Sequence, residues 1–98
     1  MTEKVFGKIT DVDEKRRMII VDHKKKNGYY YMSRGMFKQF MDYFHKHIYV
    51  FLRVKDKSRL YKGYQVQNVV SIDKLISPKG NKPKIYYENY LKEFHSQI

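Results

Sequence analysis

Residues 29–55 read YYYMSRGMFKQFMDYFHKHIYVFLRVK, and the spacing of their apolar side chains changes twice. Residues 29–32 are mostly aromatic, and residues 47–55 alternate between aliphatic and aromatic or basic side chains, so both stretches predict β-strands. Between them, apolar residues recur at intervals of three and four, which predicts a helix over residues 34–46 with Ser33 as its N-terminal cap. The apolar face of this helix consists of Phe37, Phe40, Met41 and Phe44.

Two further strands are expected before this region. Residues 5–12 are rich in β-branched side chains. Residues 17–23 contain the continuous apolar run MIIV, which indicates burial on both faces or beneath a helix. The charged residues 13–16 predict the turn between these strands. Residues 24–28 predict the next hairpin loop, in which Asn27-Gly28 is the strongest turn signal because both residues tolerate positive φ angles.

The remainder of the chain predicts a fifth strand and a second helix. The strand covers residues 60–72 and is expected to bend or bulge near Gly63 or near Gln67-Asn68. Residues 77–84 contain both prolines and form a linker. The amphipathic C-terminal helix that follows packs either on its own barrel or on another protein or second copy. Its apolar stripe consists of Tyr87, Tyr90, Leu91, Phe94 and Ile98.

We therefore expect an all-β protein with helices, in which one domain covers residues 1–76 and the linker and C-terminal helix cover residues 77–98. A helix between the third and fourth of five strands resembles the OB-fold, over about residues 4–74. That resemblance implies a five-stranded barrel whose open end is plugged by the helix. It also implies oligonucleotide binding on the second and third strands and the loops beside them.

Three stretches, residues 7–10, 28–32 and 48–51, are also faintly similar to a cold-shock domain. In that family the two aromatic motifs lie close together, whereas here the predicted helix separates them. No second glycine follows Tyr29 either. The resemblance is therefore to the OB-fold as a fold and not to the cold-shock family.

The charge of the chain is concentrated in its middle. The net charge is +11, from 21 Lys and Arg and 10 Asp and Glu. Residues 1–23 are neutral, residues 24–62 carry eleven bases and two acids, and residues 63–98 carry five bases and three acids. Such a field favours a polyanionic ligand, most often a nucleic acid. The absence of cysteine excludes disulfides and cysteine-ligated zinc, and no apolar run is long enough to span a membrane.

The basic central region also holds most of the aromatic side chains expected on strand surfaces. Aromatic rings stack on bases, and lysine and arginine pair with phosphates, so this combination is typical of single-strand binding. Alternatively, the tyrosines are ordinary residues at the edge of the core. The candidate nucleic-acid-binding residues are Lys24, Lys25, Lys26, Tyr29, Tyr31, Tyr49, Phe51, Arg53, Lys55, Arg59, Tyr61 and Lys62.

Other polar groups do not form a recognisable catalytic or metal site. His45 and His47 straddle the expected end of the helix, so their side chains need not converge on a metal. The acidic residues 11–14 fit a charged turn better than a magnesium site. The serines lie in no glycine elbow or phosphate loop. We therefore expect neither an enzyme nor a bound cofactor.

The leading hypothesis is a cytoplasmic module that binds single-stranded DNA or RNA with little sequence preference. Such a module could serve as an accessory subunit of a replication, repair or RNA-processing enzyme. The alternative is a protein-interaction module whose basic face docks on an acidic partner. Neither hypothesis requires a membrane.

Overall fold

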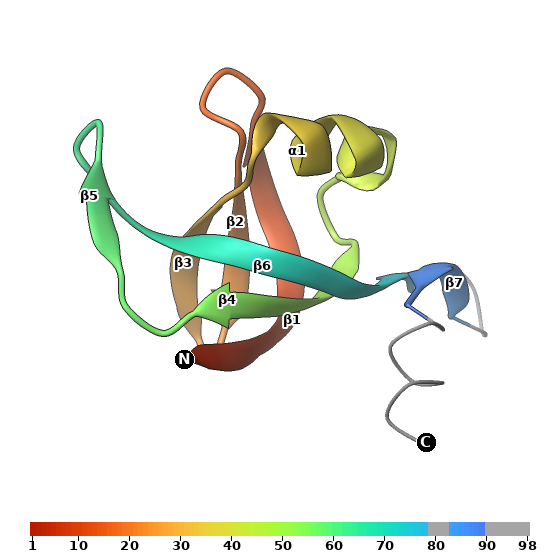
Figure 1. Ribbon diagram of the computed structural model, residues 1–98. Helices are drawn as coiled ribbons and strands as arrows, with labels where there is room; N and C mark the ends of the chain where they lie inside the picture. Colours follow the sequence, from red (N-terminus) through yellow and green to blue (C-terminus); the bar gives the residue numbers. More distant parts are fainter. Residues whose placement is uncertain (79–82, 90–98) are drawn as a thin grey trace, which may run out of the picture.

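The computed structural model describes residues 1–78 and 83–89, and these residues form mostly β-structure with one short helix (Figure 1). In chain order the elements are β1 (Thr2–Asp13), β2 (Met18–His23), β3 (Lys26–Tyr31), α1 (Arg34–Phe40), the 3-10 turn η1 (Met41–Tyr43), β4 (Tyr49–Lys55), β5 (Arg59–Tyr61), β6 (Tyr64–Ser77) and β7 (Lys84–Glu88).

Five of the strands close into a ring. β1 pairs antiparallel with both β2 and β4, β2 pairs with β3, and β4 pairs with β6. The ring closes because β3 also pairs with β6, in parallel, with Tyr29 opposite Val66 and Tyr31 opposite Asn68. β5 and β7 pair with β6 outside this ring. The expected β-rich fold with a helix between the third and fourth strands is thereby confirmed.

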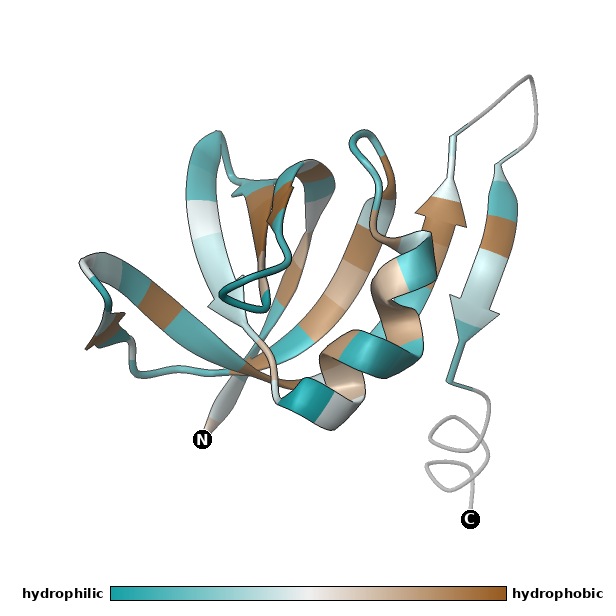
Figure 2. Ribbon diagram, turned by 90° about the horizontal axis from the view of Figure 1, so that it is seen from above, coloured by the Kyte–Doolittle hydropathy of each residue, from teal (hydrophilic) through white to brown (hydrophobic). Residues whose placement is uncertain are grey.

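Alternation along the strands produces the core. In β4, Val50, Leu52 and Val54 are buried, whereas their neighbours face outward, as the period-two pattern predicted. Val5 and Ile9 of β1 point to the same interior. Burying each such side chain stabilises the fold by about 1.5–3 kcal/mol. The brown and teal bands that alternate along the strands in Figure 2 reflect this division.

The helix lies across one end of the ring (Figure 1). Ser33 caps it as predicted, because its hydroxyl accepts a 3.2 Å hydrogen bond from the backbone N–H of Met36. Phe37, Phe40 and Phe44 are buried against the core. The prediction for Met41 was wrong, since this residue is 39% exposed. The backbone tightens to the 3-10 form at Met41, and three residues per turn rotate its side chain off the inward face.

The second hairpin turns inside the predicted loop of residues 24–28, at its first two residues and not at Asn27-Gly28. Lys24 and Lys25 take the positive φ angles of 54° and 64° that a two-residue hairpin turn requires. Asn27 and Gly28 lie instead in β3, opposite Asp22 and Val21. Gly28 is needed there for a different reason, because a Cβ atom at this position would lie 2.5 Å from the hydroxyl oxygen of Tyr30.

The predicted strand over residues 60–72 is in fact two strands. β5 and β6 form a hairpin around Lys62 and Gly63, whose φ angles are both positive, so the expected bend at Gly63 is a full reversal. β6 then continues to Ser77, beyond the predicted end. Its register against β4 shifts at two places, so Val70 and Asp73 are the extra residues of two bulges.

The C-terminal helix is corrected in the part that the structure describes. Residues 84–88 form β7, and the ring of Tyr87 packs edge-on against Phe40 at 4.8 Å. Pairing with the free edge of β6 satisfies the backbone here, which outweighs the helical spacing of the side chains. Tyr90, Leu91, Phe94 and Ile98 lie outside the described residues. No helix among the described residues is long and apolar enough to cross a membrane.

Candidate functional site

The twelve candidate residues predicted from the sequence lie in three separate places. Tyr29, Tyr31, Arg59, Tyr61 and Lys62 gather where β3 meets the β5–β6 hairpin. Tyr49, Phe51, Arg53 and Lys55 lie on the outward face of β4. Lys24, Lys25 and Lys26 form the turn of the β2–β3 hairpin and the first residue of β3.

The first place is an aromatic surface that we call the tyrosine cluster, made of Tyr29, Tyr31, Tyr61 and Tyr64. The rings form two pairs. Tyr29 packs against Tyr64 with ring centroids 5.1 Å apart and planes 46° apart, and Tyr31 packs against Tyr61 at 4.8 Å and 50°. All four side chains are partly exposed. The cluster therefore presents aromatic surface to solvent.

The backbone explains why these rings meet. Residues 29 and 31 point to the same side of β3, whereas Tyr30 between them is buried. The parallel pairing of β3 with β6 brings that side next to the start of β6. The hairpin then places Tyr61 of β5 directly opposite Tyr64 of β6, so each of these two rings reaches one ring of β3.

Basic side chains are interleaved with the rings of the tyrosine cluster. The guanidinium carbon of Arg59 lies 4.9 Å from the centroid of Tyr31 and 5.3 Å from that of Tyr61. Arg17 lies 5.3 Å from Tyr31, and Arg16 lies 5.5 Å from Tyr64. The amino group of Lys62 is 5.4 Å from the ring of Tyr61. These distances are those of cation–π contacts.

Hydrogen bonds hold two of these arginines in position. Arg59 Nε donates to Oδ1 of Asn68 at 3.1 Å. Arg17 Nε donates to the carbonyl oxygen of Met32 at 3.3 Å, and its Nη2 donates to the hydroxyl of Tyr31. Arg59 is therefore held to β6, and Arg17 is held to Tyr31 of β3 and to Met32 just beyond it. Both guanidinium groups lie beside the rings that they cover.

Arg16 is held within the β1–β2 turn. Its backbone N–H and its Nη1 both donate to the carboxylate of Asp13, at 3.0 and 2.9 Å. Partial desolvation would raise the pKa of Asp13, but these hydrogen bonds and the charge of Arg16 leave the pKa below its ordinary value of 3.8. The same contacts raise the pKa of Arg16. The acidic residues 11–14 thus contribute a carboxylate to a turn, as the sequence indicated.

Sequence reasoning missed Arg16, Arg17, Tyr64 and Asn68. The first two were assigned to a charged turn and a strand end, and nothing local to them indicates the rings of β3. A signal existed for Tyr64, because Tyr61 and Tyr64 flank the Lys62-Gly63 pair symmetrically. Reading that pair as a hairpin turn would have placed the two tyrosines opposite each other.

The second place is the outward face of β4 together with β1. Phe6, which the sequence analysis did not single out, stacks on Tyr49 at 5.8 Å with planes 19° apart, and packs on Phe51 at 4.2 Å. We call Phe6, Tyr49 and Phe51 the outer aromatic face. It is built by β1 and β4, whereas the tyrosine cluster is built by β3, β5 and β6.

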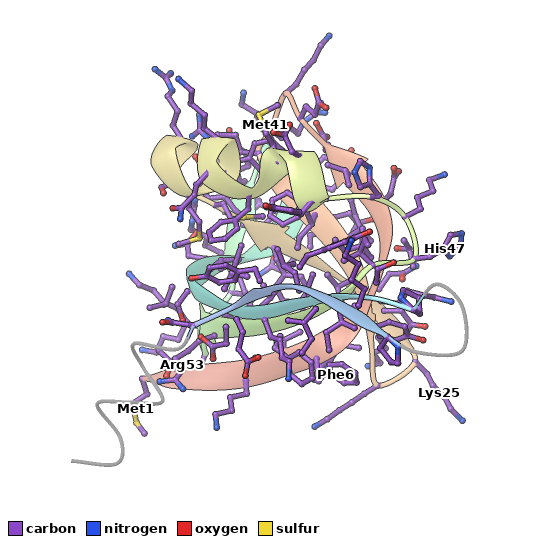
Figure 3. All side chains as sticks on the ribbon, turned by 90° about the vertical axis from the view of Figure 1, so that its right-hand side faces the viewer. Met1, Phe6, Lys25, Met41, His47 and Arg53 are labelled. Atoms are coloured by element: carbon purple, nitrogen blue, oxygen red, sulfur yellow. The ribbon has the colours of Figure 1, made fainter. Side chains whose placement is uncertain are left out.

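The turn formed by Lys24, Lys25 and Lys26, which we call the lysine turn, lies near the outer aromatic face. Lys26 pairs with His23, whose Nδ1 is 2.8 Å from the carbonyl oxygen of Phe6. Figure 3 shows Phe6 and Lys25 on the same side of the molecule, away from Met41 of η1. Tyr31 pairs with Met18 at the opposite end of the β2–β3 hairpin. At ~3.3 Å per residue, the length of β3 between Lys26 and Tyr31 is about 16 Å.

Comparisons with protein-family models, with curated proteins and with solved structures find no match.

Both His45 and His47 are exposed. In residues 1–78 and 83–89, no three histidine, aspartate or glutamate side chains gather in a geometry that could hold a metal ion.

Proposed function

We propose that the protein binds single-stranded DNA or RNA, and that the tyrosine cluster is the surface on which bases stack. One observation carries the proposal: two pairs of tyrosine rings are interleaved with Arg16, Arg17 and Arg59 on one surface. Stacking of a base on an aromatic ring contributes about 1–3 kcal/mol and tolerates any base. Because stacking needs an unpaired base, the expected ligand is a single strand.

The arginines supply the second half of the interaction. A guanidinium group can pair with a phosphate through two parallel hydrogen bonds. Arg17 and Arg59 are already fixed beside the rings, so a strand whose bases enter the tyrosine cluster brings its phosphates within their reach. The net charge of +11 adds a long-range attraction that increases the association rate.

The arrangement of the ring of strands supports the same proposal. Its five strands, its parallel β3–β6 closure and the helix between β3 and β4 resemble an OB-fold barrel. OB-folds bind oligonucleotides on strands 2 and 3, the loop between strands 1 and 2, and the loop between strands 4 and 5. The tyrosine cluster and its arginines come from the corresponding parts: β3, the β1–β2 turn and the β5–β6 hairpin.

A fluorescence anisotropy titration tests the proposal. Labelled oligo-dT and oligo-U strands and a duplex of the same length are titrated with the protein at about 50 and 200 mM salt. We expect the single strands to bind more tightly than the duplex, and the affinity to fall at the higher salt concentration. Equal affinity for single strands and duplex, or no binding at low salt, would contradict the proposal.

A further inference from the structure

The outer aromatic face extends across three strands in register. In one row Phe6 of β1, Phe51 of β4 and Lys74 of β6 are neighbours, and in the next row Lys8, Tyr49 and Ile76 are neighbours. Phe6 is 47% exposed, and large exposed apolar side chains that adjoin one another mark interaction surfaces. Tyr49 and Phe51 beside Phe6 are partly exposed.

Phe6 stands between two hollows. The first has a volume of about 370 Å³ and is lined by the apolar residues Phe6, Phe51 and Leu52 and by the charged residues Lys4, Asp73, Lys74 and Glu88. The second has a volume of about 210 Å³ and is lined by Phe6, Tyr49, Ile76 and two prolines. Each hollow has room for one or two large apolar side chains of a ligand.

The rim of the outer aromatic face is basic. Two acids near this face are matched, because Asp73 lies 3.8 Å from Arg53 and Glu88 lies 3.9 Å from Lys74, whereas Asp22 lies opposite Lys8 in the β1–β2 pairing. Lys4 and Lys8 make no such ion pair within the described part of the chain, and they lie on either side of Phe6 along β1. Lys25 of the lysine turn adds further positive charge at this side of the molecule (Figure 3).

These features fit a peptide better than a nucleic acid strand. The smaller hollow is lined by apolar groups and a tyrosine, and it offers few partners to the polar edges of a base. A nucleic acid carries a phosphate at every residue, whereas a peptide can place apolar side chains in the hollows and carboxylates beside Lys4 and Lys8.

We propose that the outer aromatic face binds an acidic segment of a partner protein that carries two or more large apolar side chains. The apolar side chains occupy the hollows on either side of Phe6, and flanking aspartates or glutamates pair with Lys4 and Lys8. This surface and the tyrosine cluster share no residue, so the inference does not rest on nucleic-acid binding. Together the two surfaces would let the protein hold a strand and a partner at once.

Selection from a phage-displayed library of random 12-residue peptides on the immobilised full chain tests this inference. We expect enriched peptides to combine aromatic or leucine residues with aspartate and glutamate. Fluorescein-labelled copies of these peptides should lose about tenfold or more in affinity for Phe6→Ser, as at other interface anchors. The double variant Lys4→Glu/Lys8→Glu should weaken binding similarly. Tyr61→Ala, in the tyrosine cluster, is the matched control and should bind the peptides normally.

Several results would overturn the inference. No enrichment, or peptides that bind Phe6→Ser as tightly as wild type, would show that this face is not a peptide site. Loss of oligonucleotide affinity in Phe6→Ser would assign the face to nucleic acid. A wild-type dimer in sedimentation velocity that Phe6→Ser dissociates would assign it to a second copy. If circular dichroism shows that Phe6→Ser is unfolded, the peptide affinity of the Lys4→Glu/Lys8→Glu variant tests the inference in its place. Amide chemical shifts of wild type should then also change at Phe6 and Phe51 on adding peptide.

Discussion

The Nε atom of Arg59 donates a 3.1 Å hydrogen bond to Oδ1 of Asn68. Asn68 lies opposite Tyr31 in the parallel β3–β6 pairing, so this bond fixes the guanidinium group next to Tyr31. The cation and the ring are therefore in place before a ligand arrives. Such preorganisation lowers the conformational entropy lost on binding.

Replacing single tyrosines of the tyrosine cluster should weaken single-strand binding. Tyr61→Ala removes a stacking surface and should reduce the binding free energy for oligo-dT by about 1–3 kcal/mol. Tyr61→Phe keeps the ring and should retain most of the affinity. Tyr49→Ala, on the outer aromatic face, is the matched control and should bind oligo-dT as wild type does. Anisotropy titrations measure all three; equal losses at positions 49 and 61 would contradict the assignment.

Arg17→Gln should change how the affinity depends on salt. If Arg17 contacts one phosphate, its loss should reduce the slope of log K against log salt concentration by about 0.7 for a single strand. Lys25→Gln is the control, because Arg17 and Lys25 both have positive φ angles, of 54° and 64°, but Lys25 lies at the far end of the β2–β3 hairpin. Its slope should match that of wild type. A smaller slope for the Lys25 variant alone would move the phosphate path to the lysine turn.

The helix should depend strongly on Phe40 and weakly on Met41. Phe40 is buried and packs against Tyr87, so Phe40→Ala should lower the free energy of unfolding by about 3–5 kcal/mol. Met41 is exposed, and Met41→Ala should cost less than about 1 kcal/mol. Urea denaturation compares the two variants. Similar losses would show that both residues belong to the core.

Two glycines should respond to alanine with opposite signs. A Cβ atom at Gly7 would lie 2.0 Å from the carbonyl oxygen of Asp22, so Gly7→Ala must displace the backbone of β2 and should destabilise the fold by about 1–3 kcal/mol. Gly35 lies in α1 with open space around it, and Gly35→Ala should stabilise by up to about 1 kcal/mol. Thermal and urea unfolding measure the sign of each change in stability. Destabilisation by Gly35→Ala would contradict the placement of this residue in a helix with open space around it.

Stability at alkaline pH should depend on Tyr30. Burial, aided by the charge of Glu3, raises the pKa of the Tyr30 hydroxyl above its ordinary value of 10.0. The folded protein then holds this proton more tightly than the unfolded chain. The resulting contribution is complete below pH 10 and is lost as the pH rises through the raised pKa. Above about pH 10 the free energy of unfolding should therefore fall more steeply in wild type than in Tyr30→Phe. Parallel curves would contradict this.

Local periodicity in the sequence determined much of the fold. The alternation of Val50, Leu52 and Val54 identified β4 and its inward face, and the spacing of Phe37, Phe40 and Phe44 identified the helix that covers the core. Both predictions depend only on neighbours within one element, whose side chains must point to the same side. Positions of turns were less certain, because Lys24 and Lys25 adopted the positive φ angles that Asn27-Gly28 was expected to take.

The tertiary structure alone decided which aromatic and basic residues share a surface. Tyr31 and Tyr61 are thirty positions apart, and they meet because β3 pairs in parallel with β6. The same sheet separates Tyr31 from Tyr49, although both lie in the basic middle of the chain. Composition told us that rings and cations were present, since both are properties of residues counted singly. Which ring faces which cation depends on strand pairing between distant segments, and no local pattern in the chain encodes that choice.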